Sequence, residues 1–61
     1  MPVVIVEMYE GRTEEQKRKL VRALTMGCVD TLRVPESAVQ VIIHDVPRIN
    51  WGIAGETQNN S

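Results

Sequence analysis

Cysteine and aromatic residues are scarce in this sequence, whose 61 residues include one cysteine, one tryptophan, one tyrosine and no phenylalanine. A single cysteine excludes a disulfide framework, and no set of cysteine and histidine residues has zinc-site spacing, so we expect no metal. Small domains usually rely on such links, because a chain of this size buries only about 60% of the surface that its unfolded form exposes. Their absence predicts that the chain is stabilised by association with further copies of itself.

Charge of one sign is scarce as well, with seven lysine and arginine residues against eight aspartate and glutamate residues. The two signs are interspersed, so the sequence has no basic stripe of the kind that binds nucleic acid. No segment approaches the roughly 18 apolar residues of a membrane span, and the N-terminus lacks the basic region of a secretory signal. We therefore expect a soluble cytoplasmic protein without nucleic-acid or membrane partners.

Apolar residues make up 43% of the chain, which indicates an aliphatic core. Residues 1–61 are too few for more than one domain, so we expect a single domain. Val3 to Met8 is almost continuously apolar and β-branched at its first four positions, which predicts a strand. Val39 to Val46 has the same character and predicts a second strand, which Pro47 ends.

The segment between the two strands has the pattern of one long helix. Thr13 and Gln16 have the spacing of a capping box, so the helix is predicted to begin at Thr13 or Glu14. Pro35 disfavours helical geometry at the residue before it, which places the helix end near Arg33. Apolar residues recur on one helical face, namely Leu20, Val21, Leu24, Cys28 and Leu32.

Strand, helix and strand in this order form a βαβ unit, whose two strands should be parallel. Glycines that alternate with apolar residues from Trp51 to Gly55 predict a short C-terminal hairpin. One helix cannot cover both faces and both edges of a two-stranded sheet. The predicted α+β fold therefore implies a closed homo-oligomer, with pockets between its subunits.

Pro2 directly precedes the first predicted strand. Removal of Met1, which a small second residue usually permits, would leave a secondary amine that titrates at about pH 8 when unperturbed. Such an amine can act as a general base at the end of a core strand. From the residue alone, an uninvolved terminal proline is the simpler interpretation.

Several stretches together carry a family resemblance. They are Pro2, Glu10-Gly11-Arg12-Thr13, Glu15-Gln16-Lys17, Val39-Gln40-Val41-Ile42-Ile43 and Asn50-Trp51-Gly52-Ile53-Ala54-Gly55. In this order and at this length they resemble the 4-oxalocrotonate tautomerase family across essentially the whole chain. The resemblance implies βαβ protomers that pair into a four-stranded sheet, with three such dimers in a hexamer. It also implies a keto–enol isomerase of aromatic compound degradation that uses no cofactor and no metal.

In that family the terminal proline moves a proton between carbon and oxygen of a 2-hydroxydienoate or another enol acid. The resemblance therefore implies that Pro2 is the catalytic base and that Arg12 binds a substrate carboxylate. It implies that Trp51 forms part of the apolar wall, and Tyr9 stands where the family often has an aliphatic pocket residue. Gln40 stands where the typical enzyme has a second arginine. Its amide adds no charge, so stabilisation of the developing enolate should be weaker.

Two other functions remain open at this point. Relatives in the family use the same proline in water addition to, or dehalogenation of, small unsaturated acids, and the change at Gln40 fits an altered substrate. Alternatively, the chain keeps Met1, which leaves the nitrogen of Pro2 in an amide, and serves only as an assembly subunit. Trp51 could equally serve interface packing.

Four further residues have simpler interpretations. We expect His44, a single histidine without an evident partner, to be structural or exposed, and Cys28 to be a buried, unreactive thiol. Gly27 weakens the helix, which predicts a close approach to another element. Arg48 is expected to be solvent-exposed, although it could supply part of the charge that Gln40 lacks.

Overall fold

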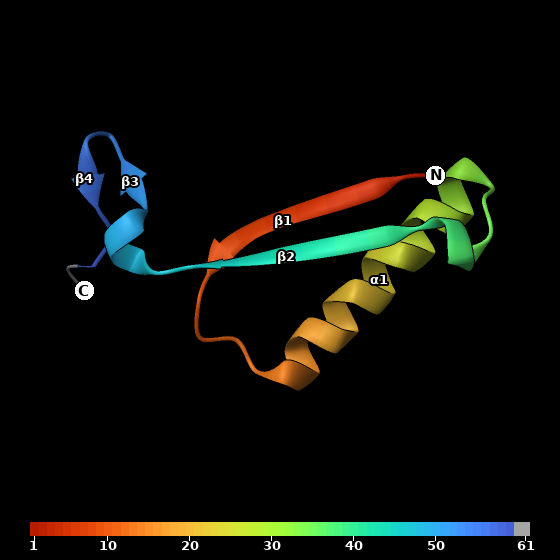
Figure 1. Ribbon diagram of the computed structural model, residues 1–61, viewed down its shortest axis with the longest axis horizontal. Helices are drawn as coiled ribbons and strands as arrows, with labels where there is room; N and C mark the ends of the chain where they lie inside the picture. Colours follow the sequence, from red (N-terminus) through yellow and green to blue (C-terminus); the bar gives the residue numbers. More distant parts are fainter. Residues whose placement is uncertain (60–61) are drawn as a thin grey trace.

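Two long parallel strands and one helix form the body of the chain, and a small hairpin extends from one end (Figure 1). The computed structural model describes residues 1–59. The elements in chain order are β1 (Val3–Tyr9), α1 (Glu14–Leu32), η1 (Glu36–Ala38), β2 (Gln40–Val46), η2 (Arg48–Asn50), β3 (Gly52–Ile53) and β4 (Glu56–Thr57), with η marking short 3-10 turns. The predicted βαβ protomer with a C-terminal hairpin is confirmed.

Strands β1 and β2 pair in parallel along their whole length, from Val3 opposite Gln40 to Tyr9 opposite Val46. Their β-branched residues suit an extended, pleated backbone, because a branched side chain packs well against neighbours on the sheet. Each strand is seven residues long, and β1 ends one residue beyond the predicted Met8. This register places the two strand ends side by side, which matters for the site below.

Helix α1 begins with the predicted capping box. The Thr13 hydroxyl accepts a hydrogen bond from the Gln16 backbone N–H at 3.1 Å, and the Gln16 side chain accepts one from the Thr13 backbone N–H at 3.0 Å. At the other end Arg33 adopts a left-handed backbone with φ of 60°, and its N–H donates to Val29. Both predicted helix ends are confirmed, because local hydrogen bonding determines them.

The hairpin of β3 and β4 is antiparallel and turns through Ala54 and Gly55. Both turn residues have positive φ, 52° and 84°, as a two-residue type I′ hairpin turn requires. The strands end at Thr57, so the hairpin runs two residues beyond the predicted Gly55. It stands away from the βαβ body, beyond the end of β2 (Figure 1).

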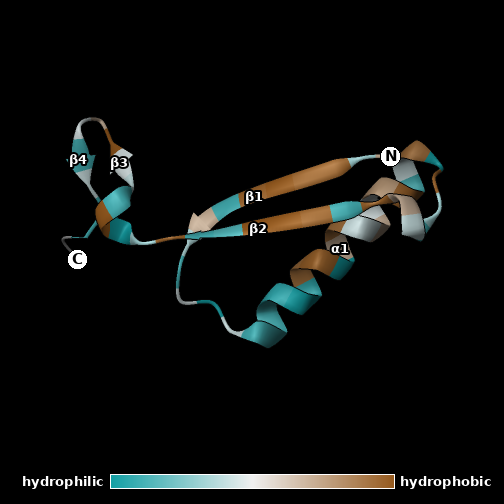
Figure 2. Ribbon diagram, in the orientation of Figure 1, coloured by the Kyte–Doolittle hydropathy of each residue, from teal (hydrophilic) through white to brown (hydrophobic). Residues whose placement is uncertain are grey.

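Helix α1 covers one face of the sheet and leaves the other open. Side chains alternate along β1, so that Val4 and Val6 are half-buried while Val3 and Ile5 are exposed. Ile5 is 58% exposed and its neighbour in register, Ile42, is 42% exposed. Figure 2 shows hydrophobic stretches in brown along both strands, interrupted by hydrophilic segments in teal. The predicted uncovered sheet face is therefore present in the single chain.

Within residues 1–59, the single chain has no fully buried side chain. Its accessible surface is 4701 Å², whereas a globular monomer of this size exposes about 4,000 Å². Its radius of gyration is 14.4 Å, against about 10.5 Å for a compact domain of this length. The shape is an open plate of 42 × 24 × 13 Å. The exposed apolar sheet face can become a hydrophobic core only when another chain covers it.

Two expectations for the helix do not hold within one chain. Cys28 is only half-buried, because α1 and two strands enclose too little space to bury it fully. Gly27 has no atom of another element within 4 Å of the position a Cβ would take, so no close approach occurs there. No helix in the described part of the chain is both long and apolar enough to cross a membrane.

Candidate active site

The predicted site residues fall into two groups at opposite ends of β1. Pro2 and Gln40 lie where β1 and β2 begin, whereas Tyr9 lies where β1 ends and Trp51 follows the end of β2. Seven strand residues at about 3.3 Å each separate Pro2 from Tyr9 by about 23 Å. Figure 1 shows the N-terminus and the hairpin at opposite ends of the molecule. One chain therefore does not bring all the predicted residues together.

At the N-terminal end, the Pro2 carbonyl accepts a hydrogen bond from the Gln40 backbone N–H at 3.0 Å. Pro2 is half-buried and Gln40 is exposed, so both have surface available for a ligand. Met1 is 78% exposed and makes the nitrogen of Pro2 part of an amide. The strand pairing thus holds Pro2 in a defined position beside Gln40, as a base at this place would need.

At the other end, three side chains form a stacked cluster that we call the aromatic cluster, made of Tyr9, Arg48 and Trp51. The Tyr9 and Trp51 rings meet edge to face with centroids 4.6 Å apart. The guanidinium carbon of Arg48 lies 4.1 Å from the centroid of the Tyr9 ring. Arg48 is exposed, as expected, but its contact with Tyr9 was not predicted. The contact depends on the strand register, which places the residues after Val46 beside Tyr9 and which no local pattern in the sequence specifies.

A shallow depression of about 450 Å³ adjoins this cluster and includes Arg12. Its lining residues are Met8, Tyr9, Arg12, Gln16 and Leu20. Arg12 lies between Gly11, which has a φ of 116°, and the helix cap Thr13, so the turn and the capping box together position it. Tyr9 lines the depression and also stacks on Arg48. Tyr9 therefore contacts Arg48 and shares the depression with Arg12.

Arg12 and Arg48 form no ion pair with any carboxylate of residues 1–59. By contrast, four cationic side chains of the helix form ion pairs. Lys17 pairs with Asp45, Arg18 with Glu14, Lys19 with Glu15 and Arg22 with Glu36. An unpaired guanidinium beside apolar surface is suited to binding a carboxylate, which it can hold through two parallel hydrogen bonds. This end of the molecule therefore has the chemistry of an anion site.

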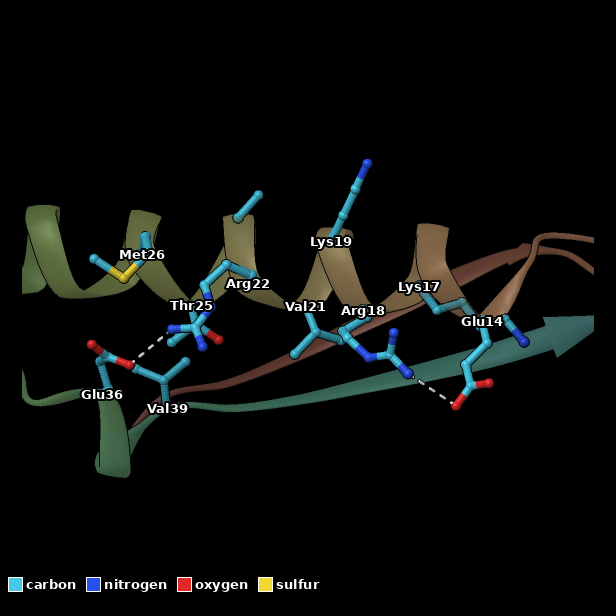
Figure 3. A pocket seen from close by; sticks show the side chains of 11 residues that line it. Glu14, Lys17, Arg18, Lys19, Val21, Arg22, Thr25, Met26, Glu36 and Val39 are labelled. Carbon is cyan, nitrogen blue, oxygen red and sulfur yellow. Dashed lines mark hydrogen bonds and ion pairs between the residues drawn. The ribbon is translucent and has the colours of Figure 1, made fainter.

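A larger groove of about 860 Å³ lies between α1 and the segment that leads into β2 (Figure 3). It contains none of the predicted site residues. Its arginines are paired at 3.1 Å, Arg18 with Glu14 and Arg22 with Glu36, as the dashed lines in Figure 3 show. Because these charges are already neutralised, the groove is a poor candidate for an anionic substrate.

His44 lies on the open sheet face and is exposed, as expected. Contrary to expectation it has a partner, because its Nδ1 lies 2.7 Å from a carboxylate oxygen of Glu7, the residue opposite it in register. Neither residue belongs to the aromatic cluster. Among residues 1–59, no three His, Cys, Asp or Glu side chains gather closely enough to hold a metal ion.

Known proteins share this fold and much of this sequence. The family described as Tautomerase enzyme matches residues 2–59 of the chain. A 2-hydroxymuconate tautomerase of Comamonas testosteroni is 47% identical over 55 residues, which cover 90% of this chain and 87% of that protein. A second 2-hydroxymuconate tautomerase, from Pseudomonas putida, is 42% identical and covers 90% of this chain and 87% of its own length.

Solved structures agree. A 4-oxalocrotonate tautomerase isozyme of Methylibium petroleiphilum superposes with a TM-score of 0.90 at 42% identity, covering 93% of this chain and 92% of its own. A heterohexameric 4-oxalocrotonate tautomerase of Chloroflexus aurantiacus superposes with a TM-score of 0.93 at 35% identity, covering 98% and 97%. The chain is thus an isomerase with tautomerase activity. It belongs to the 4-oxalocrotonate tautomerase family.

Proposed function

We propose that this chain is a cofactor-independent tautomerase that converts a 2-hydroxydienoate or a similar enol acid into the conjugated ketone. The general base is the amine of Pro2, which becomes free when Met1 is removed. Relatives at 47% and 42% identity are named 2-hydroxymuconate tautomerases, which supports a dicarboxylate of this class as substrate. The half-buried Pro2 beside Gln40 supports the proton-transfer role.

The observation that carries the proposal of a site between chains is the separation of the two groups of residues along β1. Pro2 and Gln40 of one chain must meet Tyr9, Arg12 and Trp51 of another chain to complete a site. The exposed apolar sheet face, including Ile5 and Ile42, favours such assembly because burying it removes apolar surface from water. We infer a homo-oligomer, with a hexamer as the family's resemblance implies, whose sites lie between subunits.

In the proposed reaction, the nitrogen of Pro2 accepts the proton of the substrate's 2-hydroxyl group. The oxygen–hydrogen bond breaks, the carbonyl forms, and the electron pair shifts along the diene to a remote carbon. The protonated amine then returns its proton to that carbon, so no electrons are lost or gained. Arg12 holds a carboxylate, the Gln40 amide donates to the developing oxyanion, and the rings of Tyr9 and Trp51 exclude water.

The experiment is steady-state kinetics on 2-hydroxymuconate, with the intact mass of each preparation measured in parallel. Protein without Met1 should be active, and Pro2→Ala should lower kcat/KM about a hundredfold, because the primary amine of alanine has a different basicity and lacks the rigid ring that fixes the position of the base. Lys19→Ala, which changes an exposed helix residue, serves as the control and should leave the rate unchanged. Full activity in protein that retains Met1, or in Pro2→Ala, would rule out the proline base.

A second candidate reaction is water addition or dehalogenation with the same base. It is favoured by Gln40, whose backbone N–H bonds the Pro2 carbonyl and whose side chain is uncharged, which fits a substrate that develops less charge at this end of the strands. Turnover of a 3-halo-acrylate at a higher kcat/KM than 2-hydroxymuconate would assign this reaction instead. The assembly-subunit alternative is tested by the mass measurement, because retained Met1 leaves no amine at Pro2.

A further inference from the structure

We propose that Arg48 is a second carboxylate-binding residue of this site and determines its preference for dicarboxylates over monocarboxylates. The inference rests on the proposed function. It assigns to Arg48 a positive charge for substrate binding, whereas Gln40 provides none. The observation behind it is the aromatic cluster, in which Arg48 stacks on Tyr9 and Tyr9 lines the depression that includes Arg12.

Two hydrogen bonds to the carbonyl oxygen of Arg48 hold its backbone in place. That oxygen accepts hydrogen bonds from the backbone N–H of Trp51 at 3.1 Å and of Gln58 at 3.2 Å. Pro47 precedes it with a restricted φ of −59° and starts the turn η2. A side chain on a backbone held at three points loses less freedom when a ligand binds, so its affinity for the ligand is higher.

The side chain of Arg48 is positioned without being neutralised. Its guanidinium carbon lies 4.1 Å over the Tyr9 ring, and one of its nitrogens makes a long contact of 3.5 Å with the Gln58 carbonyl. Both neighbours are uncharged, and no carboxylate of residues 1–59 pairs with it. Aromatic stacking orients a guanidinium while its edge stays free to donate hydrogen bonds. The group is therefore prepared for an external anion.

Two guanidinium groups near one aromatic residue suit a ligand with two separated carboxylates. Arg12 lines the same depression as Tyr9, and Arg48 stacks on the Tyr9 ring from the turn after β2. A ligand with one carboxylate can use only one of them. The expected preference for dicarboxylates then comes from this end of the chain, whereas Gln40 at the other end contributes no charge.

The test measures binding instead of turnover, so it does not depend on the proposed reaction. Adipate and hexanoate are unreactive six-carbon acids with two carboxylates and one, respectively. Trp51 is the single tryptophan and contacts Tyr9, so its fluorescence reports occupancy of the cluster. We expect the native protein to bind adipate more tightly. Arg48→Ala should weaken adipate binding about tenfold, as loss of one charged hydrogen-bond partner does, and leave hexanoate binding nearly unchanged.

Two variants make the result specific. Arg48→Lys keeps the charge without the planar stack, and its adipate affinity should lie between those of the native protein and Arg48→Ala. Lys19→Ala removes the same charge from a helix residue that points away from the strands in Figure 3, and it should bind adipate normally. Equal affinity of the native protein for both acids, or an equal loss for both in Arg48→Ala, would overturn the inference. If Pro2→Ala stayed fully active, only the proposed reaction would be wrong.

Discussion

Tyr9 connects the two cationic residues of the candidate site. Its ring supports Arg48 at 4.1 Å, meets Trp51 at 4.6 Å and lines the depression that includes Arg12. An aliphatic residue at this position would fill space but would provide no π face for a guanidinium. Tyr9 and Arg48 therefore form one structural unit at this end of the chain.

This linkage gives a prediction for Tyr9. Tyr9→Leu should raise KM for 2-hydroxymuconate several-fold, because it removes an aromatic pair worth about 1 kcal/mol and a cation–π contact worth about 0.5–1 kcal/mol. Tyr9→Phe is the matched control, since it keeps the ring and loses only the hydroxyl, and its KM should stay within about twofold. Steady-state kinetics on both variants distinguishes them. A similar KM for Tyr9→Leu and Tyr9→Phe would contradict a role for the ring.

The candidate residues could be named from the sequence, but their grouping could not. Pro2, Arg12 and Trp51 stand in a recognisable order, and each has a distinct chemistry. The sequence predicted that Arg48 is solvent-exposed, because an arginine in an exposed turn has no pattern that indicates a binding role. Its contact with Tyr9 depends on the register of two strands that are 30 residues apart, and no local signal specifies that register.

At the scale of elements, the turn into α1 positions Arg12. Gly11 supplies a positive φ, Thr13 and Gln16 close the capping box, and Arg12 lies between them. Lys17 in the first turns of the helix pairs with Asp45 near the end of β2, which ties α1 to the sheet at this end. The depression beside Arg12 therefore depends on the helix start being well formed.

Thr13→Ala should destabilise the protein by about 1 kcal/mol, because the Gln16 backbone N–H at the helix start loses its partner, the Thr13 hydroxyl. Thr13→Ser keeps the hydroxyl and should retain most of the stability. Urea unfolding followed by circular dichroism, at one fixed protein concentration, measures the difference. KM should rise in Thr13→Ala as Arg12 becomes less ordered. An unchanged unfolding midpoint would show that assembly alone holds the helix start.

Element bounds were predictable where local chemistry determines them. The capping box gave the start of α1, Pro35 its end, and β-branched runs the two strands, each within a residue or two. The hairpin was harder, because Ala54 at a positive φ is unusual for a residue with a Cβ. The close approach that the sequence predicted at Gly27 is absent within one chain, because no atom of another element lies within 4 Å of the position its Cβ would take.

On the scale of the whole molecule, the chain is incomplete as a folding unit and as a site. Without a fully buried side chain in residues 1–59, the protomer gains little hydrophobic stabilisation. The same strand β1 that exposes Val3 and Ile5 also keeps Pro2 about 23 Å from Tyr9. In the proposed assembly, contacts between chains supply both the missing core and the missing half of each site, so stability and activity should depend together on protein concentration.

Complementation between two impaired variants tests this assembly directly. Pro2→Ala chains carry a primary amine in place of the proposed proline base, and Arg12→Ala chains lack the proposed carboxylate anchor, so each variant alone should have a low kcat/KM. When the two are co-expressed in equal amounts, about a quarter of the sites should combine an intact Pro2 with an intact Arg12, because the two residues come from different chains. The mixed oligomer should then recover about a quarter of the native kcat/KM. Separately purified variants, mixed without exchange of subunits, serve as the control. If both residues of a site came from one chain, no mixed site could contain both, and the co-expressed sample would stay at the mean of its two parents.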